Sequence, residues 1–99
     1  MMGVEMLSSC RAALRIPADC AVYDDEIVDL IDAARSAMVA GGVSPQKANS
    51  GDDGMIRLAI KVYVKAHFGM DNPDAERLAA SFDSLLTTMR GSAEYGGSK

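Results

Sequence analysis

Few side chains in this chain have the chemistry that catalysis or metal binding requires. The sequence contains one histidine, His67, and two cysteines, Cys10 and Cys20. A nucleophilic triad or a zinc site would depend wholly on His67, because the cysteines form neither a CxxC pair nor part of a four-ligand set. On a helical wheel His67 shares an arc with Ile56 and Ile60, so we interpret it as a half-buried structural residue. Cys10 lies on the apolar face of its helix and is interpreted as a small buried hydrophobe.

The run GDDG offers carboxylates without the pattern of a metal site. Asp52 and Asp53 lack the alternating oxygen ligands and terminal Glu of a calcium loop, and capping of the next helix explains them better. Tyr63 and Phe82 stand at helical spacings and are interpreted as core residues rather than stacking platforms for bases. We therefore expect no enzyme, no cofactor and no bound metal. An enzyme subunit that uses His67 stays open as an alternative, and a His67→Ala activity comparison would test it.

Charge is distributed unevenly along the chain. The formal net charge of −4 argues against a general phosphate-binding protein, because nucleic-acid affinity comes mainly from clustered Lys and Arg. Residues 1–32 contain seven acids against two arginines, whereas residues 54–70 contain no acid and three bases, Arg57, Lys61 and Lys65. These three bases could form an ordinary solvent face, a strip that faces DNA, or a partner surface for carboxylates.

The elements that must position these residues are helices. The chain has 99 residues, 48% of them hydrophobic, with seven methionines and no tryptophan, which favours close helix packing over a sheet. The apolar spacings predict four helices, over about Val4 to Arg15, Asp25 to Ala40, Asp53 to Gly69 and Asn72 to Arg90. Asp24 and Asn72 are the expected N-caps, with Pro73 at the first position of the last helix. The polar segment from Ser44 to Gly54 is predicted to be a loop of about a dozen residues.

The third predicted helix is apolar around most of its circumference. Such a helix lies either at the centre of a core or between a core and a neighbouring subunit. After Arg90 the composition lacks apolar periodicity, so residues 91–99 are predicted to be mobile until a partner orders them. The predicted fold class is all-α: a small bundle of four principal helices over residues 1–90 with a flexible C-terminal tail over 91–99. No apolar run approaches the length of a membrane span and no signal peptide opens the chain, so we expect synthesis in the cytoplasm.

An ordered set of short motifs carries a family resemblance. LR, DDEI, LIDAA, GV, AI, YVKAHFG, DNP and AER follow one another at characteristic spacings from about Met6 to Tyr95. The chain thereby resembles the small phage head-to-tail connector proteins, the DNA-packaging adaptors that form a ring beneath the portal. Two features depart from the family pattern: CAVY precedes DDEI, and Leu78 stands where an aromatic residue is common.

The resemblance implies a structural protein of the virion neck, encoded by a phage or prophage and made in the bacterial host cytoplasm. It implies a closed ring of about twelve copies, a dodecamer, that binds the portal and extends the DNA channel towards a stopper or tail-completion protein. Genomic DNA would pass through the lumen without specific binding, since a strongly basic bore would slow ejection.

Two sets of site residues are expected on this view. A ring needs two different patches of one subunit to meet on its neighbours, and acids facing bases would satisfy this. The expected interface residues are Asp25, Asp29 and Asp32 on one subunit, and Arg57, Lys61 and Lys65 on the next. In this family the C-terminal segment docks against the portal, and Tyr95 is the expected aromatic anchor there.

The other function class left open is a small helical DNA-binding or regulatory protein. It is weakened because a recognition helix should expose polar and basic residues at its start, whereas the third helix opens with Asp52, Asp53, Gly54 and Met55.

Overall fold

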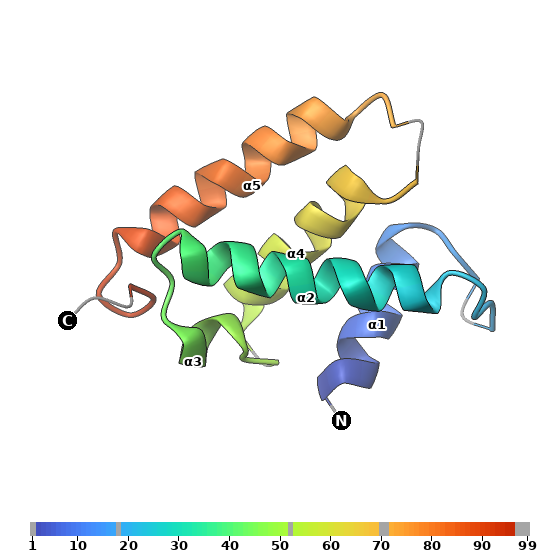
Figure 1. Ribbon diagram of the computed structural model, residues 1–99, viewed down its shortest axis with the longest axis horizontal. Helices are drawn as coiled ribbons and strands as arrows, with labels where there is room; N and C mark the ends of the chain where they lie inside the picture. The colour runs from blue at the N-terminus through green and yellow to red at the C-terminus, as the bar shows by residue number, and fades with distance from the viewer. Residues whose placement is uncertain (1, 18, 52, 70–71, 97–99) are drawn as a thin grey trace.

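The computed structural model describes residues 2–17, 19–51, 53–69 and 72–96, with side chains from Met6 onward. Within these ranges the chain folds into helices joined by turns (Figure 1). They are α1 (Met2–Ala13), α2 (Asp24–Ala40), α3 (Pro45–Ala48), α4 (Gly54–His67) and α5 (Ala75–Arg90). The predicted all-α fold with four principal helices is confirmed. The short α3 lies within the segment that was predicted to be a loop throughout.

Local chemistry explains both the matches and the differences at helix ends. α1 ends at Ala13 rather than Arg15, because Arg15 has a φ of 62°, in the left-handed region, and cannot continue the helix. Asp24 is the first residue of α2 rather than its cap, and its carboxylate faces Arg11 instead. α3 begins at a Ser44 cap, whose hydroxyl accepts a hydrogen bond from the Lys47 amide, followed by Pro45.

The predicted start of the last helix is wrong by two residues. Asn72 forms a turn ahead of α5: its side-chain oxygen accepts from the Asp74 amide, and its side-chain amide donates to the carbonyl of Lys65 at 2.6 Å. The helix therefore begins at Ala75. Asp53, by contrast, caps α4 as predicted for the GDDG run, since its carboxylate accepts from the amides of Met55 and Ile56. Asp52 lies outside the described residues.

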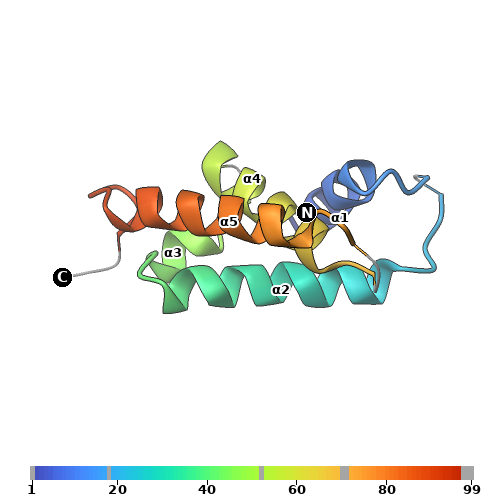
Figure 2. The ribbon, with the colours of Figure 1, turned by 90° about the horizontal axis from the view of Figure 1, so that it is seen from above.

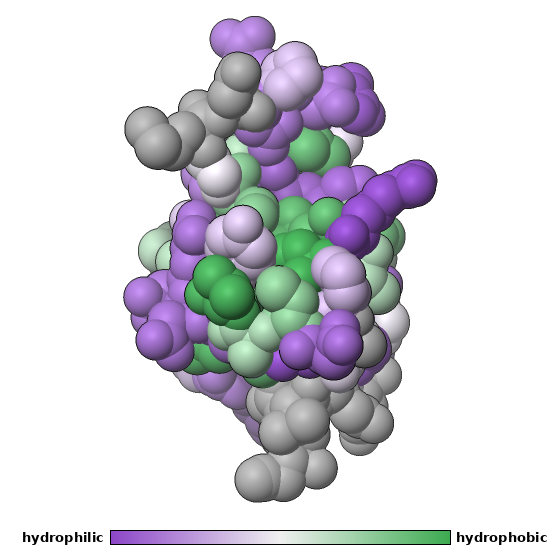
Figure 3. Space-filling view, turned by 90° about the vertical axis from the view of Figure 1, so that its right-hand side faces the viewer, coloured by the Kyte–Doolittle hydropathy of each residue, from purple (hydrophilic) through white to green (hydrophobic). Residues whose placement is uncertain are grey.

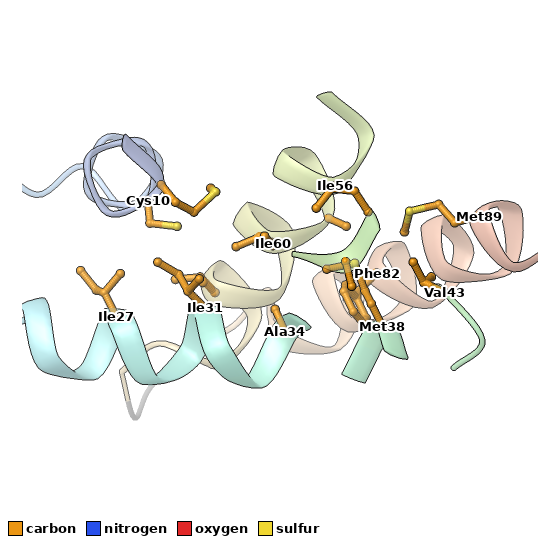
Figure 4. Close-up of a cluster of buried hydrophobic side chains, with 14 residues drawn as sticks. Cys10, Ile27, Ile31, Ala34, Met38, Val43, Ile56, Ile60, Phe82 and Met89 are labelled. Atoms are coloured by element: carbon orange, nitrogen blue, oxygen red, sulfur yellow. The ribbon is translucent and has the colours of Figure 1, made fainter. Parts of the chain in front are cut away.

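The core forms around α4, which packs against α5, α2 and α1. Ile56, Ile60 and Val64 on one side of α4 are fully buried, as is Cys10 on α1. Figure 4 shows the side chains of α1, α2, α4 and α5 converging on this cluster. Phe82 is buried too, and Tyr63 packs against it edge to face with ring centres 5.0 Å apart.

His67 is exposed rather than half-buried as predicted. It is the last residue of α4, so no following helical turn covers it. Its ring lies against that of Tyr63, with centres 4.3 Å apart. The wheel position placed His67 on the correct side of the helix, but the helix end takes it to the surface.

The molecule is a flat slab of about 42 × 32 × 17 Å between Cα atoms. Seen from above in Figure 2, α2 runs along one broad side, while α4 and α1 lie on the other. Because α2 and α4 bury the sides that face each other, their solvent-exposed sides point in opposite directions.

Residues 91–96 turn back towards the helical body and contact it. The composition of this segment did not predict these contacts. The Ser44 amide donates to the carbonyl of Tyr95 at 2.8 Å, and an antiparallel bridge pairs Val43 with Gly96. Tyr95 is part-buried against the core. The mobility of this segment in solution stays a prediction, and residues 97–99 of the predicted tail lie outside the described residues.

Candidate functional site

The first candidate surface is the outer side of α2. Asp25, Asp29 and Asp32 are all exposed there, as the amphipathic pattern predicts. Two apolar side chains share this side, Val28 at 41% exposure and Val39 at 38%. The three aspartates lie opposite the buried side of the helix, and the two valines lie beside them along one edge of the exposed side. We call this acidic and partly apolar stripe the α2 ridge.

The three basic residues of α4 differ in their surroundings. Lys65 is exposed and Lys61 is partly exposed on the outer side of the helix. The guanidinium of Arg57, however, donates to the Ser9 hydroxyl at 2.6 Å and to the Gly51 carbonyl at 3.2 Å. Arg57 thus links α4 by hydrogen bonds to α1 and to the preceding loop. Ser9 lies 48 residues away in the chain, so no local pattern signals this contact.

The second candidate surface is a groove between α4 and α5. Leu58, at 46% exposure, and Val62 form its α4 wall. The α5 wall consists of Arg77, Ala80, Ser81, Ser84 and Leu85. We call this surface the α4–α5 groove. The sequence signal for the groove was that the third predicted helix is apolar around more of its circumference than one packing partner could cover.

The acidic and basic surfaces lie on opposite sides of the slab. The structure therefore does not bring Asp25, Asp29 or Asp32 to Lys61 or Lys65 within one subunit (Figure 2). Of the six predicted interface residues, Arg57 binds Ser9 and Gly51 of its own subunit. Lys61 is partly exposed, and the other four are exposed. The arrangement gives one subunit two unlike surfaces that point away from each other.

A polar cluster surrounds Tyr95, the predicted portal anchor. Its hydroxyl lies 2.9 Å from each carboxylate oxygen of Asp53 and donates to that group. Lys47 Nζ lies 3.5 Å from Asp53 Oδ2, 3.4 Å from Glu94 Oε2 and 5.2 Å from the centre of the Tyr95 ring. Tyr95 therefore already has partners within its own subunit.

Hydrogen bonding shifts the pKa values in this cluster. The bond to Asp53, with burial and that carboxylate's charge, raises the pKa of Tyr95 to about 12. Burial raises the pKa of Asp53, but the bonds from Tyr95 and from the amides of Ile56 and Met55 outweigh it. The net pKa of Asp53 lies below its usual value, and the nearby charge of Lys47 acts in the same direction.

Two arginines missed by sequence reasoning hold the linkers in place. Arg11 on α1 donates to both carboxylate oxygens of Asp24, at 2.9 and 2.6 Å, closing the 14–23 linker. This hydrogen bond lowers the pKa of Asp24. Arg35 on α2 donates to the carbonyls of Ala48 and Ser50 at 2.7 and 3.2 Å, fixing the segment after α3. Both contacts join residues at least 13 positions apart, beyond the reach of helical periodicity.

An apolar patch covers the end of the molecule at the α1–α2 linker. Val22 is 81% exposed and Tyr23 is 44% exposed, and the Tyr23 ring meets Phe68 edge to face. Figure 3 faces this end and shows hydrophobic surface gathered near its centre among hydrophilic residues.

The chemically reactive side chains are dispersed. Cys10 is a buried free thiol whose pKa burial raises to about 11, and Cys20 is a partly exposed free thiol. In the part of the chain that the structure describes, no group of three or more His, Cys, Asp or Glu is placed to hold a metal ion. Its helices also include none with the length and hydropathy needed to cross a bilayer.

One comparison with known proteins is informative. A family model described as phage connector protein matches residues 6–96. Comparisons with curated proteins and with solved structures gave no match.

Proposed function

The chain belongs to the phage connector protein family, and from this premise we propose that it is a structural, non-enzymatic protein of the virion neck. About twelve copies would close into a ring beneath the portal, linking the packaged head to the stopper or tail-completion protein. The gene would belong to a phage or prophage, with synthesis in the bacterial host cytoplasm. The observation that carries this proposal is a family match spanning residues 6–96, almost the whole chain.

The two unlike surfaces favour a ring over a symmetric pair. A two-fold dimer uses the same patch on both subunits, whereas a ring repeats a contact between two different patches. Acids on the α2 ridge and lysines on the outer side of α4 provide two such patches with opposite charge. The net charge of −4 also suits a channel through which DNA slides without being held.

The direct test combines the purified chain with the portal protein from the same phage genome. We expect a ring of this chain seated on the portal in electron micrographs, and a mass by light scattering that corresponds to many copies per portal. Failure of the chain to join the portal at any concentration would contradict the proposal. Salt-dependent binding to duplex DNA in place of portal binding would favour the small DNA-binding protein instead.

Ionic strength and charge reversal test the contribution of the charged faces. Raised salt should weaken the ring, because exposed ion pairs contribute only about 0.2 to 1 kcal/mol each and are screened. Reversing Lys61 and Lys65 to Glu should abolish assembly while helicity is retained. Arg57 is left out of this variant because it binds Ser9 and Gly51. Rings from the double variant, stable at all salt concentrations, would rule out charge pairing.

Portal docking is proposed for the C-terminal segment, with Tyr95 as its aromatic anchor. For the whole Tyr95 side chain to bind the portal, its hydrogen bond to Asp53 would first have to break. Truncation after Arg90 should weaken portal binding, and Tyr95→Ala should account for a substantial part of that loss. Tyr95→Phe keeps the ring and removes the internal hydrogen bond, so it should bind the portal at least as well as the native chain. Equal portal binding by the truncated and intact chains would show that the helical body docks instead.

A further inference from the structure

We propose that the α2 ridge of one subunit docks into the α4–α5 groove of the next copy of this chain. The inference deepens the proposed ring, on which it rests, by naming the two surfaces that meet at every subunit boundary. It differs from simple charge pairing because the contact is centred on apolar side chains. It also replaces Arg57 by Arg77 among the basic residues.

Both surfaces carry apolar side chains, and their lengths are of the same order. Val28 and Val39 are exposed on the ridge, and Leu58, Val62 and Leu85 line the groove. Between its two valines the ridge is about 16 Å long, given a helical rise of about 1.5 Å per residue. The α5 wall from Arg77 to Leu85 runs for about 12 Å on the same basis. Joining the surfaces removes apolar area from water on both partners.

The charges around these apolar centres are complementary. Asp25, Asp29 and Asp32 flank the valines of the ridge. Among its described lining residues the groove has no acid, Arg77 lies in its wall, and Lys61 and Lys65 share the outer side of α4. Arg77 lies 3.4 Å from Asp74, but both side chains are more than half exposed, so this surface pair leaves the guanidinium open to a second carboxylate.

The placement of the surfaces makes the contact a repeating one. The helices α2 and α4 lie on opposite broad sides of a slab about 17 Å thick (Figure 2). The aspartates of the ridge and Leu58 of the groove are exposed on these two helices, so one subunit can engage two neighbours. Each copy presents its ridge to one neighbour and its groove to the other. Such a heterologous contact continues from copy to copy until it closes.

Disulfide trapping between two chains that each carry one introduced surface cysteine tests the pairing directly, even where free subunits associate weakly. In a Cys20→Ser background, one chain carries Val28→Cys and the other carries Leu58→Cys, while buried Cys10 is retained. Because a disulfide requires Cα atoms within about 7 Å, a mixture of the two should form the mixed dimer only if ridge meets groove. We expect the mixed dimer, identified by mass, to form at least tenfold faster than with a Gln46→Cys control. Gln46 is exposed on α3, outside the groove.

Charge variants show whether trapping reports the proposed contact. Adding Lys61→Glu and Lys65→Glu to the groove chain should slow trapping about tenfold. Adding Asp29→Lys and Asp32→Lys to the ridge chain should then restore it. Unchanged circular dichroism and melting temperature confirm that each variant is folded. The proposal is overturned if the mixed dimer forms no faster than with the Gln46→Cys control. It is also overturned if neither pair of charge substitutions changes the rate at which the mixed dimer forms.

A chain with both Val28→Cys and Leu58→Cys separates failure of the surfaces from failure of the ring. We expect a ladder of covalent oligomers that extends well beyond the dimer. Products that stop at the dimer would overturn the head-to-tail geometry and the proposed ring together. Absence of trapping by a chain that still forms rings on the portal would overturn the ridge and groove alone.

Discussion

At the scale of single residues, Asp53 connects three parts of the chain. Its carboxylate caps α4, accepts the Tyr95 hydroxyl from the C-terminal segment, and lies near Lys47 on α3. Since its pKa is lowered, these contacts stabilise the fold above the usual titration range of Asp and are lost as pH falls through the lowered value. A helix cap predicted from local sequence thus also organises contacts between distant segments.

The pKa of Tyr95 provides a test of this cluster. Its hydroxyl should ionise near pH 12 instead of 10, because ionisation removes the proton that it donates to Asp53, and burial and the charge of that carboxylate act in the same direction. The raised pKa means that the contact stabilises the fold fully below pH 10 and is lost as pH rises through about 12. The phenolate absorbance of the native chain minus that of Tyr95→Phe isolates this group. If the difference in absorbance instead rises near pH 10, the ordinary pKa of tyrosine, the hydrogen bond to Asp53 is absent in solution.

Ile60 and Lys61 test the orientation of α4. Ile60 is fully buried, so Ile60→Ala should lower the free energy of unfolding by about 2 to 5 kcal/mol. Its neighbour Lys61 lies on the outer side, and Lys61→Ala should change that energy by less than about 0.5 kcal/mol. Urea unfolding of both variants measures the difference, and equal effects would contradict the helical phase.

At the scale of elements, α4 explains why its sequence is apolar on so many sides. It contacts α1, α2 and α5, and its remaining apolar residues, Leu58 and Val62, form one wall of the groove. The sequence offered two explanations, a central helix or a helix shared with a neighbouring subunit. The structure confirms the central position, and the proposed docking would add the second role.

The turn after α2 depends on a glycine. Gly42 has a φ of 108°, and a Cβ there would lie 3.0 Å from Cγ of Arg90 on α5. Gly42→Ala should therefore cost about 1 to 3 kcal/mol of stability in thermal unfolding. Gly54 is the matched control: it begins α4, has no positive φ and has open space around a Cβ, so Gly54→Ala should be neutral or slightly stabilising. A Gly42 variant as stable as the Gly54 variant would show that the turn adapts without strain.

At the scale of the whole molecule, the C-terminal segment contributes to the free subunit as well as to any partner. Truncation after Arg90 removes the Tyr95 hydrogen bonds and the bridge between Val43 and Gly96. From composition alone, truncation should leave the melting temperature almost unchanged. The observed contacts instead predict that truncation lowers the free energy of unfolding by about 1 to 3 kcal/mol, and the melting temperature with it. Thermal unfolding of the truncated and intact chains decides between the two expectations. An unchanged melting temperature would show that the segment is passive in the free protein.

The sequence by itself determined the features that depend on neighbours within about one helical turn. The helical periodicity identified α2 and α4 and their buried sides, and the GDDG run placed a cap at Asp53. The ordered motifs from LR to AER identified the family that the match over residues 6–96 shows. These features can be predicted from sequence because capping and amphipathicity depend on residues three to four positions apart.

Only the tertiary structure decided where those elements meet. Arg57 reaches Ser9 across 48 residues, and Tyr95 reaches Asp53 across 42, so no local pattern could show that either side chain is already engaged. The groove beside Leu58 also arises only when α5 packs beside α4. The physical reason is that packing between helices depends on complementary surfaces distant in sequence, whereas periodicity reports only which side of each helix turns inward.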